Sequence, residues 1–260
     1  MSAKLGLFGA LAAAVAVVVG CGEAAQGPTG PHQATAPREP TAPAAPSTGP
    51  RSEPYHFGDV QAKAPPTVDG MAPIVRRIPT DKRYVFITID DGDIKDPNAL
   101  DLIKKSGARP TLFLAQKFVT GHEDYFRKIR DETGAVIQDH TINHPNLRGK
   151  PYALQRKEIC DNADAETTEF GHRPMLFRPP YGNYDGNTQK AAADCGMRVI
   201  VLWTAAVNDG VVQFQRGDHL NPGDIVLMHF RKTFVEDYTA FVERAERDGL
   251  TAVPLSDFLG

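Results

Sequence analysis

Short runs of apolar, β-branched residues alternate with helical patterns from residue 67 to residue 260, and this alternation constrains the fold more than any other feature. Strands that alternate with helices predict a parallel sheet whose strands are joined by crossover helices. The expected strands cover residues 85–89, 111–114, 135–138, 176–177, 199–203, 225–228 and 251–253. The sequence therefore predicts an α/β domain.

The helical patterns between these runs complete the expected domain. They cover residues 99–105, 125–132, 154–170, 187–194 and 235–248, and several are followed by a glycine, which is a common helix stop. Residues 208–222 are the exception, because they lack clear periodicity. A complete eightfold barrel usually needs about 250 residues. We therefore expect a distorted, incomplete (β/α) barrel of about seven parallel strands.

The first residues have the composition of an export signal. A basic start at Lys4 is followed by an uncharged run, residues 5–20, that is too short to suggest a spanning helix. The letters VVGC before and at Cys21 resemble the lipobox of bacterial lipoproteins, which implies cleavage ahead of Cys21 and lipidation of this cysteine. The alternative is a simple secretory peptide that is cut near residues 22–25 and discards Cys21.

Residues 21–66 are rich in Pro, Ala, Gly, Ser and Thr and have almost no large aliphatic side chains. Such a segment cannot bury enough apolar surface to offset the entropy lost on ordering, so we expect a disordered tether. The predicted organisation is a signal peptide (1–20), a tether (21–66) and one domain (67–260). The domain is expected to be exported and anchored by lipid to the extracellular face of the cell membrane.

Charge and cysteine content limit the partners. The formal net charge is −3 at pH 7, and no basic patch interleaved with aromatic residues occurs, which argues against nucleic acid. We expect a monomer. Cys160 and Cys195 each lie on an expected helix in consecutive strand–helix units, and export would permit a disulfide. A bridge and two buried thiols both remain open.

Polar residues follow the expected strands at the ends where barrel enzymes carry their active sites. These residues are Asp90 and Asp91 after the first strand, His140 after the third, Arg178 after the fourth and His229 after the sixth. His140 and His144 are four residues apart, a spacing that places both imidazoles on one face of a helical turn. One carboxylate and two imidazoles predict a divalent metal site, with zinc as the first choice and cobalt, nickel or manganese as alternatives.

Five segments in this order resemble the polysaccharide deacetylase family, carbohydrate esterase family four. They are TIDDG at 88–92, HTINH at 140–144, RPPYG at 178–182, residues 203–210, and LMH at 227–229. The resemblance covers the chain from about residue 82 to its end. It implies a distorted, incomplete barrel with one metal-dependent site at the carboxyl ends of its strands.

The resemblance also implies a role for each motif residue. Asp91, His140 and His144 would hold the metal, and Asp90 would be the general base that takes a proton from the attacking water. Asp139 would either orient a histidine or be a solvated loop carboxylate.

Three further roles follow from the later motifs. Arg178 would hold the base carboxylate in place, the backbone N–H of Tyr181 would donate to the oxyanion, and His229 would be the general acid. Leu227, Pro180 and Trp203 would line the substrate pocket. Trp203 could equally be a core residue at the end of a strand.

The fourth motif departs from the family pattern. The family usually presents an Asp three residues after a Trp, then a second Asp and a Trp, and these support the arginine and the histidine. Here Ala206 replaces the first Asp and Gly210 the second Trp, so that only Asp209 survives. Asp209 could swing in to compensate.

The sequence thus predicts a metal-dependent hydrolase that removes N-acetyl, or alternatively O-acetyl, groups from a carbohydrate polymer such as peptidoglycan, a chitin-like chain or xylan. One rival is a catalytically weakened or inactive domain that binds glycan or metal, which Ala206 and Gly210 favour. A second rival is an exported metal-binding or solute-binding lipoprotein. Asp90, Arg178 and His229 argue against it, because scavenging needs none of them.

Overall fold

The computed structural model of the chain describes residues 55–260. The predicted signal peptide, the predicted lipidation site Cys21 and residues 21–54 of the predicted tether lie outside the described residues. Within residues 55–260, no helix is both long enough and apolar enough to cross a membrane.

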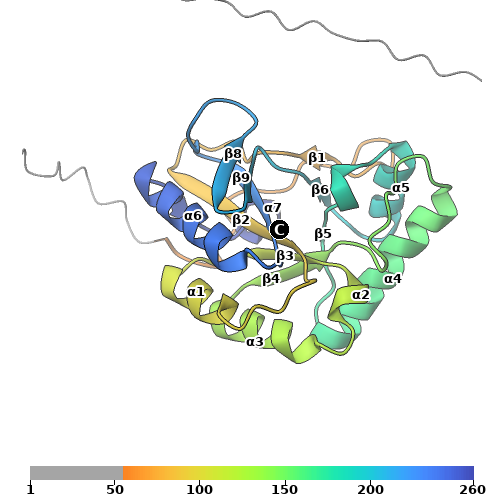
Figure 1. The fold of residues 1–260 in the computed structure, drawn as a ribbon. Helices are drawn as coiled ribbons and strands as arrows, with labels where there is room; N and C mark the ends of the chain where they lie inside the picture. Colours follow the sequence, from red (N-terminus) through yellow and green to blue (C-terminus); the bar gives the residue numbers. More distant parts are fainter. Residues whose placement is uncertain (1–54) are drawn as a thin grey trace, which may run out of the picture. The chain divides into compact units, whose positions relative to one another are not determined.

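A single sheet forms the centre of the described domain (Figure 1). Its strand order is β1-β6-β5-β4-β3-β2-β9-β7-β8, and β10 pairs with the start of β2. All strand pairs are parallel except β7 and β8, which form an antiparallel hairpin. The strands are β1 (Ile74–Val75), β2 (Tyr84–Asp91), β3 (Thr111–Leu114), β4 (Val136–Asp139), β5 (Leu176–Phe177), β6 (Val199–Val201), β7 (Ala205–Asn208), β8 (Val211–Phe214), β9 (Ile225–His229) and β10 (Thr251–Ala252). The sheet curls, and its edge strands β1 and β8 are not paired with each other, so the predicted incomplete barrel is confirmed.

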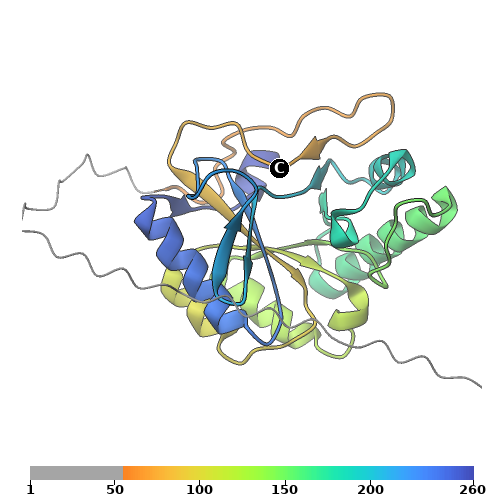
Figure 2. The same ribbon diagram turned by 45° about the horizontal axis from the view of Figure 1, so that its top comes forward.

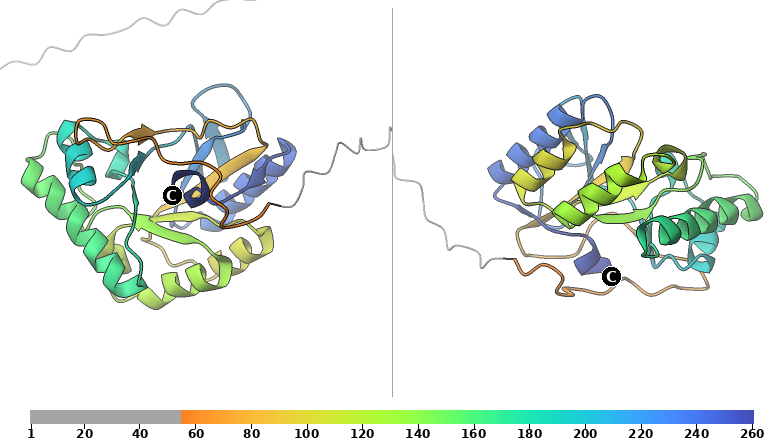
Figure 3. Two further views of the ribbon diagram at one scale, coloured as in Figure 1. Left: turned by 180° about the vertical axis from the view of Figure 1, so that it is seen from behind. Right: turned by 90° about the horizontal axis from the view of Figure 1, so that it is seen from below.

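Helices cover the outer face of the curled sheet. Figures 2 and 3 show α6, α1 and α3 along one side and α4 with α5 along another. The helices are α1 (Ala99–Ser106), α2 (Gln116–Val119), α3 (Glu123–Thr133), α4 (Tyr152–Phe170), α5 (Gly186–Asp194), α6 (Phe234–Arg247) and α7 (Ser256–Leu259). The five helices predicted from periodicity are confirmed. The single-turn helices α2 and α7 are too short to produce a periodic signal.

All seven predicted strands are confirmed, and the sheet contains three more. Strand β1 has only two residues, and β7 and β8 lie in and around the segment that lacked periodicity. The turn between β7 and β8 is Asp209–Gly210, with φ of 52° and 73°. Two successive left-handed residues with the letters Asp-Gly are the signature of a tight hairpin turn, so the signal for this hairpin was present in the sequence.

Strand β2 contributes to two separate cores, because successive side chains of a strand point to opposite faces. Val85, Ile87 and Ile89 face the helices and belong to the core beneath α1, α3 and α6. Phe86 faces the inside of the barrel, where it packs in a second core with Phe113. The same alternation places Asp90, four residues after Phe86, on the inner face.

The last residues assigned to the tether by composition lie against the domain. The Tyr55 hydroxyl donates to Asp257 Oδ2 at 2.7 Å, and the Gly58 N–H donates to the same oxygen at 3.1 Å. The Tyr55 ring stacks edge to face with Tyr84 at the start of β2, with ring centroids 5.2 Å apart. These contacts, made by residues that precede position 67, cover the end of the barrel opposite the carboxyl ends of the strands.

Helices α4 and α5 are held together covalently. Cys160 of α4 and Cys195, the residue after α5, are joined by a disulfide with their Cα atoms 4.9 Å apart. Of the two alternatives left open by the sequence, the structure contains the bridge. Both cysteines are buried in a third core, beneath these two helices.

Asp185 caps α5 and ties it to the neighbouring loop. Its Oδ1 accepts from the Thr188 N–H at 3.0 Å, and its Oδ2 accepts from the Gly149 N–H at 2.7 Å. Burial raises the pKa of Asp185, but the hydrogen bonds from Gly149 and Thr188 outweigh burial and lower this pKa below its usual value. The charged carboxylate therefore stabilises the folded state.

We expect Asp185→Ala to lower the free energy of unfolding by about 1–2 kcal/mol at pH 7, the typical cost of losing a helix cap. Because the folded-state pKa is lowered, this contribution is present above the unfolded pKa of about 4 and is lost as the pH falls through the lower folded value. Urea denaturation at pH 7 and pH 3 measures the difference. Asp161→Ala, which removes an exposed carboxylate of α4, is the control and should change stability little. A loss at Asp185 of equal size at both pH values would contradict the capping role.

Candidate functional site

At the carboxyl end of β2, two adjacent carboxylates point in different directions. Asp90 points into the barrel and is only 3% exposed, whereas Asp91 ends the strand with a left-handed backbone, φ 72°. Gly92 follows with φ 87°, and a Cβ atom there would lie 2.9 Å from the Phe126 ring. The positive φ at Asp91 turns its carboxylate away from the path of the strand, so that the two side chains have different neighbours.

Arg178 holds the inner carboxylate. It follows β5, its side chain is fully buried, and its Nη1 donates to Asp90 Oδ1 at 2.6 Å and to Thr88 Oγ1 at 2.7 Å. Burial lowers the pKa of Arg178, and the Asp90 carboxylate opposes this effect. The pairing is the one expected from the family resemblance.

Main-chain carbonyls and an aromatic ring complete the surroundings of Arg178. Its Nε donates to the Val201 carbonyl at 3.1 Å, and its Nη2 lies 3.5 Å from the Leu202 carbonyl. The guanidinium also lies over the Phe113 ring, 4.3 Å from the centroid. Carbonyls at the end of β6 thus act as acceptors, so this arginine needs no carboxylate from the altered fourth motif.

Thr88 lies in the TIDDG motif, but no role was predicted for it from the sequence. Its hydroxyl donates to the Val226 carbonyl at 2.8 Å while it accepts from Arg178, so it fixes the guanidinium relative to β9. The signal was present in the sequence: Thr88 lies two residues before Asp90 on a strand, and such residues share a face.

His140 and His144 meet through a loop, and the expected helical turn is wrong. The segment after β4 has no helical hydrogen bonding, and Thr141 and His144 adopt left-handed backbones with φ of 75° and 56°. Asp139 Oδ1 accepts from the Thr141 N–H at 2.8 Å, and Thr141 Oγ1 accepts from the His144 N–H at 3.0 Å. These side-chain caps hold the strained loop in the shape that brings both imidazoles together.

Both roles expected for Asp139 are wrong. It is fully buried, so it is no solvated loop carboxylate, and it binds the Thr141 backbone instead of an imidazole. Burial raises the pKa of Asp139, and burial together with the Asp139 charge raises that of the neighbouring Glu166. The acceptor that orients His140 is the Arg178 carbonyl, 2.7 Å from His140 Nδ1.

Asp91, His140 and His144 converge on one point. The two Nε2 atoms lie 3.3 Å and 3.0 Å from Asp91 Oδ1, and all three ligand atoms lie within 4.8 Å of one another. His140 Nδ1–H donates to the Arg178 carbonyl, so the Nε2 lone pair of a neutral imidazole faces the carboxylate. Asp91 Oδ1 is buried and lacks a well-directed hydrogen bond among the described residues. A divalent cation fits these donors, because it would relieve the repulsion between the lone pairs.

The charges at this point reinforce one another. Burial raises the pKa of Asp91, but the imidazoles of His140 and His144 outweigh it and lower this pKa far below the usual value. For His140 burial lowers the pKa, and the carboxylates of Asp90 and Asp91 outweigh it and raise the pKa. Asp90 Oδ2 lies 3.8 Å from His140 Nε2, so the inner carboxylate borders the three ligands without belonging to the set.

His229 completes the polar cluster from the end of β9. It pairs in register with Asp90, so both side chains lie on the same face of the sheet. Burial lowers the pKa of His229, with the charges of Asp90 and Asp91 opposing. Its Nδ1 is buried and has no hydrogen-bond partner among the described residues. Asp209 does not supply one, because it lies exposed in the turn between β7 and β8.

The expected pocket residues surround this cluster. Tyr181 has a left-handed backbone, φ 61°, and its ring, which is 65% exposed, lies edge to face against His144 at 4.8 Å between centroids. Pro180 and Leu227 are buried, and Trp203 is half-buried against the inner core. The Trp203 ring lies against Gly182, where an added Cβ would come within 2.8 Å of it.

We expect Arg178→Met to lower the free energy of unfolding by about 3–5 kcal/mol, because the Asp90 carboxylate would remain buried without its cation. The double variant Arg178→Met, Asp90→Asn should regain part of this loss, since it removes the unpaired charge. Chemical denaturation of the two single variants and the double variant measures the coupling. Strictly additive losses would contradict the buried ion pair as the reason.

Comparison with known proteins identifies relatives of this chain. A family model described as polysaccharide deacetylase matches residues 77–200. An uncharacterized protein of Streptomyces coelicolor is 40% identical over 195 residues, which are 73% of this chain and 78% of that protein. A peptidoglycan-N-acetylglucosamine deacetylase of Bacillus cereus is 29% identical over 159 residues, which are 58% of this chain and 57% of that enzyme.

Solved structures share the fold. The chitin deacetylase of Colletotrichum lindemuthianum superposes with a TM-score of 0.63 at 21% identity, over 73% of this chain and 92% of that one. A CE4 family pseudoenzyme from Bacillus anthracis superposes with a TM-score of 0.62 at 22% identity, over 73% of this chain and 69% of that one. At these identities the likeness concerns the fold.

Proposed function

Because this chain belongs to the polysaccharide deacetylase family, we propose that it is a metal-dependent hydrolase that removes N-acetyl, or alternatively O-acetyl, groups from a carbohydrate polymer. The observation that carries the proposal is the convergence of Asp91, His140 and His144 beside a separate carboxylate, Asp90, that Arg178 holds in place. A scavenging protein would need the first three residues alone. The additional pair is the arrangement that a hydrolysis reaction requires.

Asp91, His140 and His144 would hold the metal, with zinc as the first choice and cobalt, nickel or manganese as alternatives. When bound, such an ion polarises a carbonyl and lowers the pKa of water. One carboxylate oxygen of Asp90 is engaged by Arg178, and the other faces the His140 imidazole. The second oxygen is therefore placed to accept a proton from the attacking water.

His229 is proposed as the acid that protonates the leaving amine. His229 of β9 pairs in register with Asp90 of β2, so the proposed proton donor and proton acceptor come from adjacent strands. The Tyr181 backbone N–H is proposed as the donor to the oxyanion. Pro180 holds the backbone on one side of this residue, and the buried Leu227 would line the place of the acetyl methyl.

The proposed substrate class follows from the chemistry of the site and from the names of related proteins. Relatives carry names that refer to peptidoglycan N-acetylglucosamine, chitin and xylan. We propose a cell-envelope or extracellular glycan of this kind. The proposed setting is outside the cell, anchored by lipid at Cys21, and the Cys160–Cys195 disulfide is compatible with an oxidising compartment. The chain is proposed to act as a monomer.

The function is tested with the full chain loaded with zinc or cobalt, by measuring acetate released from acetylated chito-oligomers, peptidoglycan and xylan. We expect Asp90→Asn to reduce the rate roughly 100-fold or more while the metal content stays unchanged, because it removes the base alone. His144→Ala should lower both activity and metal content. Glycan binding without acetate release would favour the inactive alternative. Metal uptake without glycan binding and without acetate release would favour the scavenging protein.

A weakened enzyme is the one alternative that a specific observation supports. Ala206 stands where the family usually has an Asp, and the His229 Nδ1 atom is buried without a hydrogen-bond partner among residues 55–260. On β7, Ala206 pairs in register with Leu227, so its side chain lies on the same face of the sheet as that of His229. The acid is therefore less well supported than in the family pattern.

We expect Ala206→Asp to increase the rate of acetate release about 10- to 100-fold, the usual size of the effect of a supporting carboxylate. The new carboxylate would also raise the pKa of His229, so the descending limb of the pH–rate profile should move to higher pH. Ala206→Asn is the matched control, because it adds similar volume without charge. Equal effects of the two substitutions would contradict support by the charge.

A further inference from the structure

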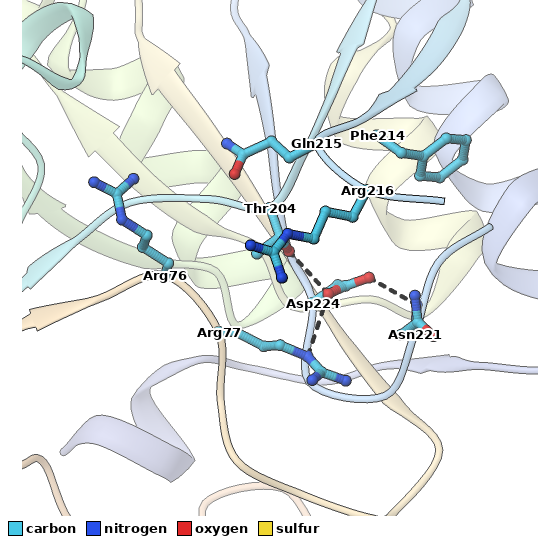
Figure 4. Close-up of a pocket in the computed structure, with 8 residues that line it drawn as sticks. All are labelled: Arg76, Arg77, Thr204, Phe214, Gln215, Arg216, Asn221 and Asp224. Carbon is cyan, nitrogen blue, oxygen red and sulfur yellow. Dashed lines mark hydrogen bonds and ion pairs between the residues drawn. The ribbon is translucent and has the colours of Figure 1, made fainter. Parts of the chain in front are cut away.

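The incomplete closure of the barrel leaves a hollow of about 430 Å³ between the two edges of the sheet. It is lined by residues that follow β1, by the residue that precedes β7, by the end of β8 and the residues after it, and by residues that precede β9 (Figure 4). The lining residues are Arg76, Arg77, Thr204, Phe214, Gln215, Arg216, Asn221 and Asp224. None of them belongs to the candidate metal centre.

Three arginines and one carboxylate line this hollow, although the whole chain carries a net charge of −3. Arg77 is already engaged: its Nε lies 3.4 Å from Asp224 Oδ1, and its Nη2 donates to the Pro222 carbonyl at 2.5 Å. Both oxygens of Asp224 are engaged as well, because Oδ1 accepts from the Thr204 hydroxyl at 2.9 Å and Oδ2 accepts from the Asn221 N–H at 2.7 Å. The carboxylate in the hollow therefore already has partners from three other residues of the lining.

Arg76 and Arg216 have no acceptor or ion-pair partner among residues 55–260. They come from segments about 140 positions apart, yet both guanidinium groups lie at the same hollow, as Figure 4 shows. Because both cations line one hollow, an anion bound there would be attracted by both. Each guanidinium offers a planar fork of N–H donors, which matches the oxygens of a phosphate or a carboxylate.

Gln215 adds a neutral donor between the two free arginines. One N–H of its side-chain amide is directed to the Trp203 carbonyl at 2.9 Å, which fixes the amide and leaves its second N–H available. The Gln215 backbone N–H donates to the Thr204 carbonyl at 3.0 Å, so the position of the residue is fixed at two points. The Gln215 amide is therefore held in place before a ligand arrives.

We propose that this hollow is an anion-binding site for a phosphate or carboxylate group, with Arg76 and Arg216 as its main ligands and Gln215 as a neutral donor. Its volume is in the range of small-molecule sites and accommodates such a group together with a sugar ring. The anion is either free in solution or carried on an acidic glycan. The site is independent of the proposed deacetylase activity, because it shares no residue with the metal centre.

The test measures binding of two probes to the full chain by isothermal titration calorimetry at constant ionic strength. The probes are inorganic phosphate and oligogalacturonate, and neutral dextran oligomers serve as the uncharged comparison. We expect Arg216→Gln and Arg76→Gln each to weaken binding about tenfold or more, because each removes a charge-assisted contact. Arg247→Gln removes an equally exposed charge at the end of α6 and should leave binding unchanged.

Binding of either probe that is lost in the Arg76→Gln, Arg216→Gln double variant supports the site. Tighter binding of oligogalacturonate identifies a group on a glycan, and binding of phosphate alone identifies a free anion. The proposal is overturned if neither probe binds, or if the double variant and Arg247→Gln bind as the unchanged protein does. Acetate release by the double variant, measured without either probe, should stay at its original rate, so failure here is distinct from failure of the proposed function.

Discussion

The buried ion pair between Arg178 and Asp90 is the interaction on which the rest of the site depends. Both side chains lie inside the barrel, where an unpaired charge would be costly, so each needs the other in a defined position. Arg178 is further bound to Thr88 on β2 and to the Val201 carbonyl on β6. The pair therefore joins strands from distant parts of the sheet and gives Asp90 one oxygen that is held and one that is free.

Backbone strain is concentrated around the same point. Asp91, Thr141, His144 and Tyr181 have left-handed backbones, a conformation that costs about 1–3 kcal/mol for residues other than glycine. Side-chain hydrogen bonds offset part of this cost: Asp139 caps the Thr141 N–H, and Thr141 caps that of His144. The strain has a structural result, because it turns three side chains from two different loops toward one place that regular strands or helices would not reach.

The open seam of the barrel links the departure from the family pattern to the proposed anion site. Residues 203–210, which carry the altered motif, bend from β6 into β7 and then form the hairpin with β8. The start of β7 carries Ala206, and among the described residues the His229 Nδ1 atom has no acceptor. The start of β7 pairs with the end of β8, which Gln215 and Arg216 follow at the hollow beside β1. The Trp203 carbonyl, bound by Gln215, lies between the two regions. The segment with the altered motif therefore also supplies the backbone acceptors that hold Gln215 at the seam.

Seven of the ten strands and the five longer helices could be predicted from sequence, because alternation of strand and helix patterns and glycine stops are local properties of the chain. The residue types of the candidate metal centre could also be predicted, since Asp91, His140 and His144 follow predicted strands whose ends meet at one rim. Thr88 could have been found from the alternation on β2.

Other features depend on contacts between distant segments, which no local pattern encodes. The loop that replaces the expected turn at His140, the burial of Asp139 and the carbonyl acceptors of Arg178 arise only when β4, β5 and β6 are side by side. The same holds for Arg76 and Arg216, which line one hollow at the seam because the curled sheet stops short of closing. Local pattern thus decided which residues occupy the rim, and packing decided which of their atoms face one another.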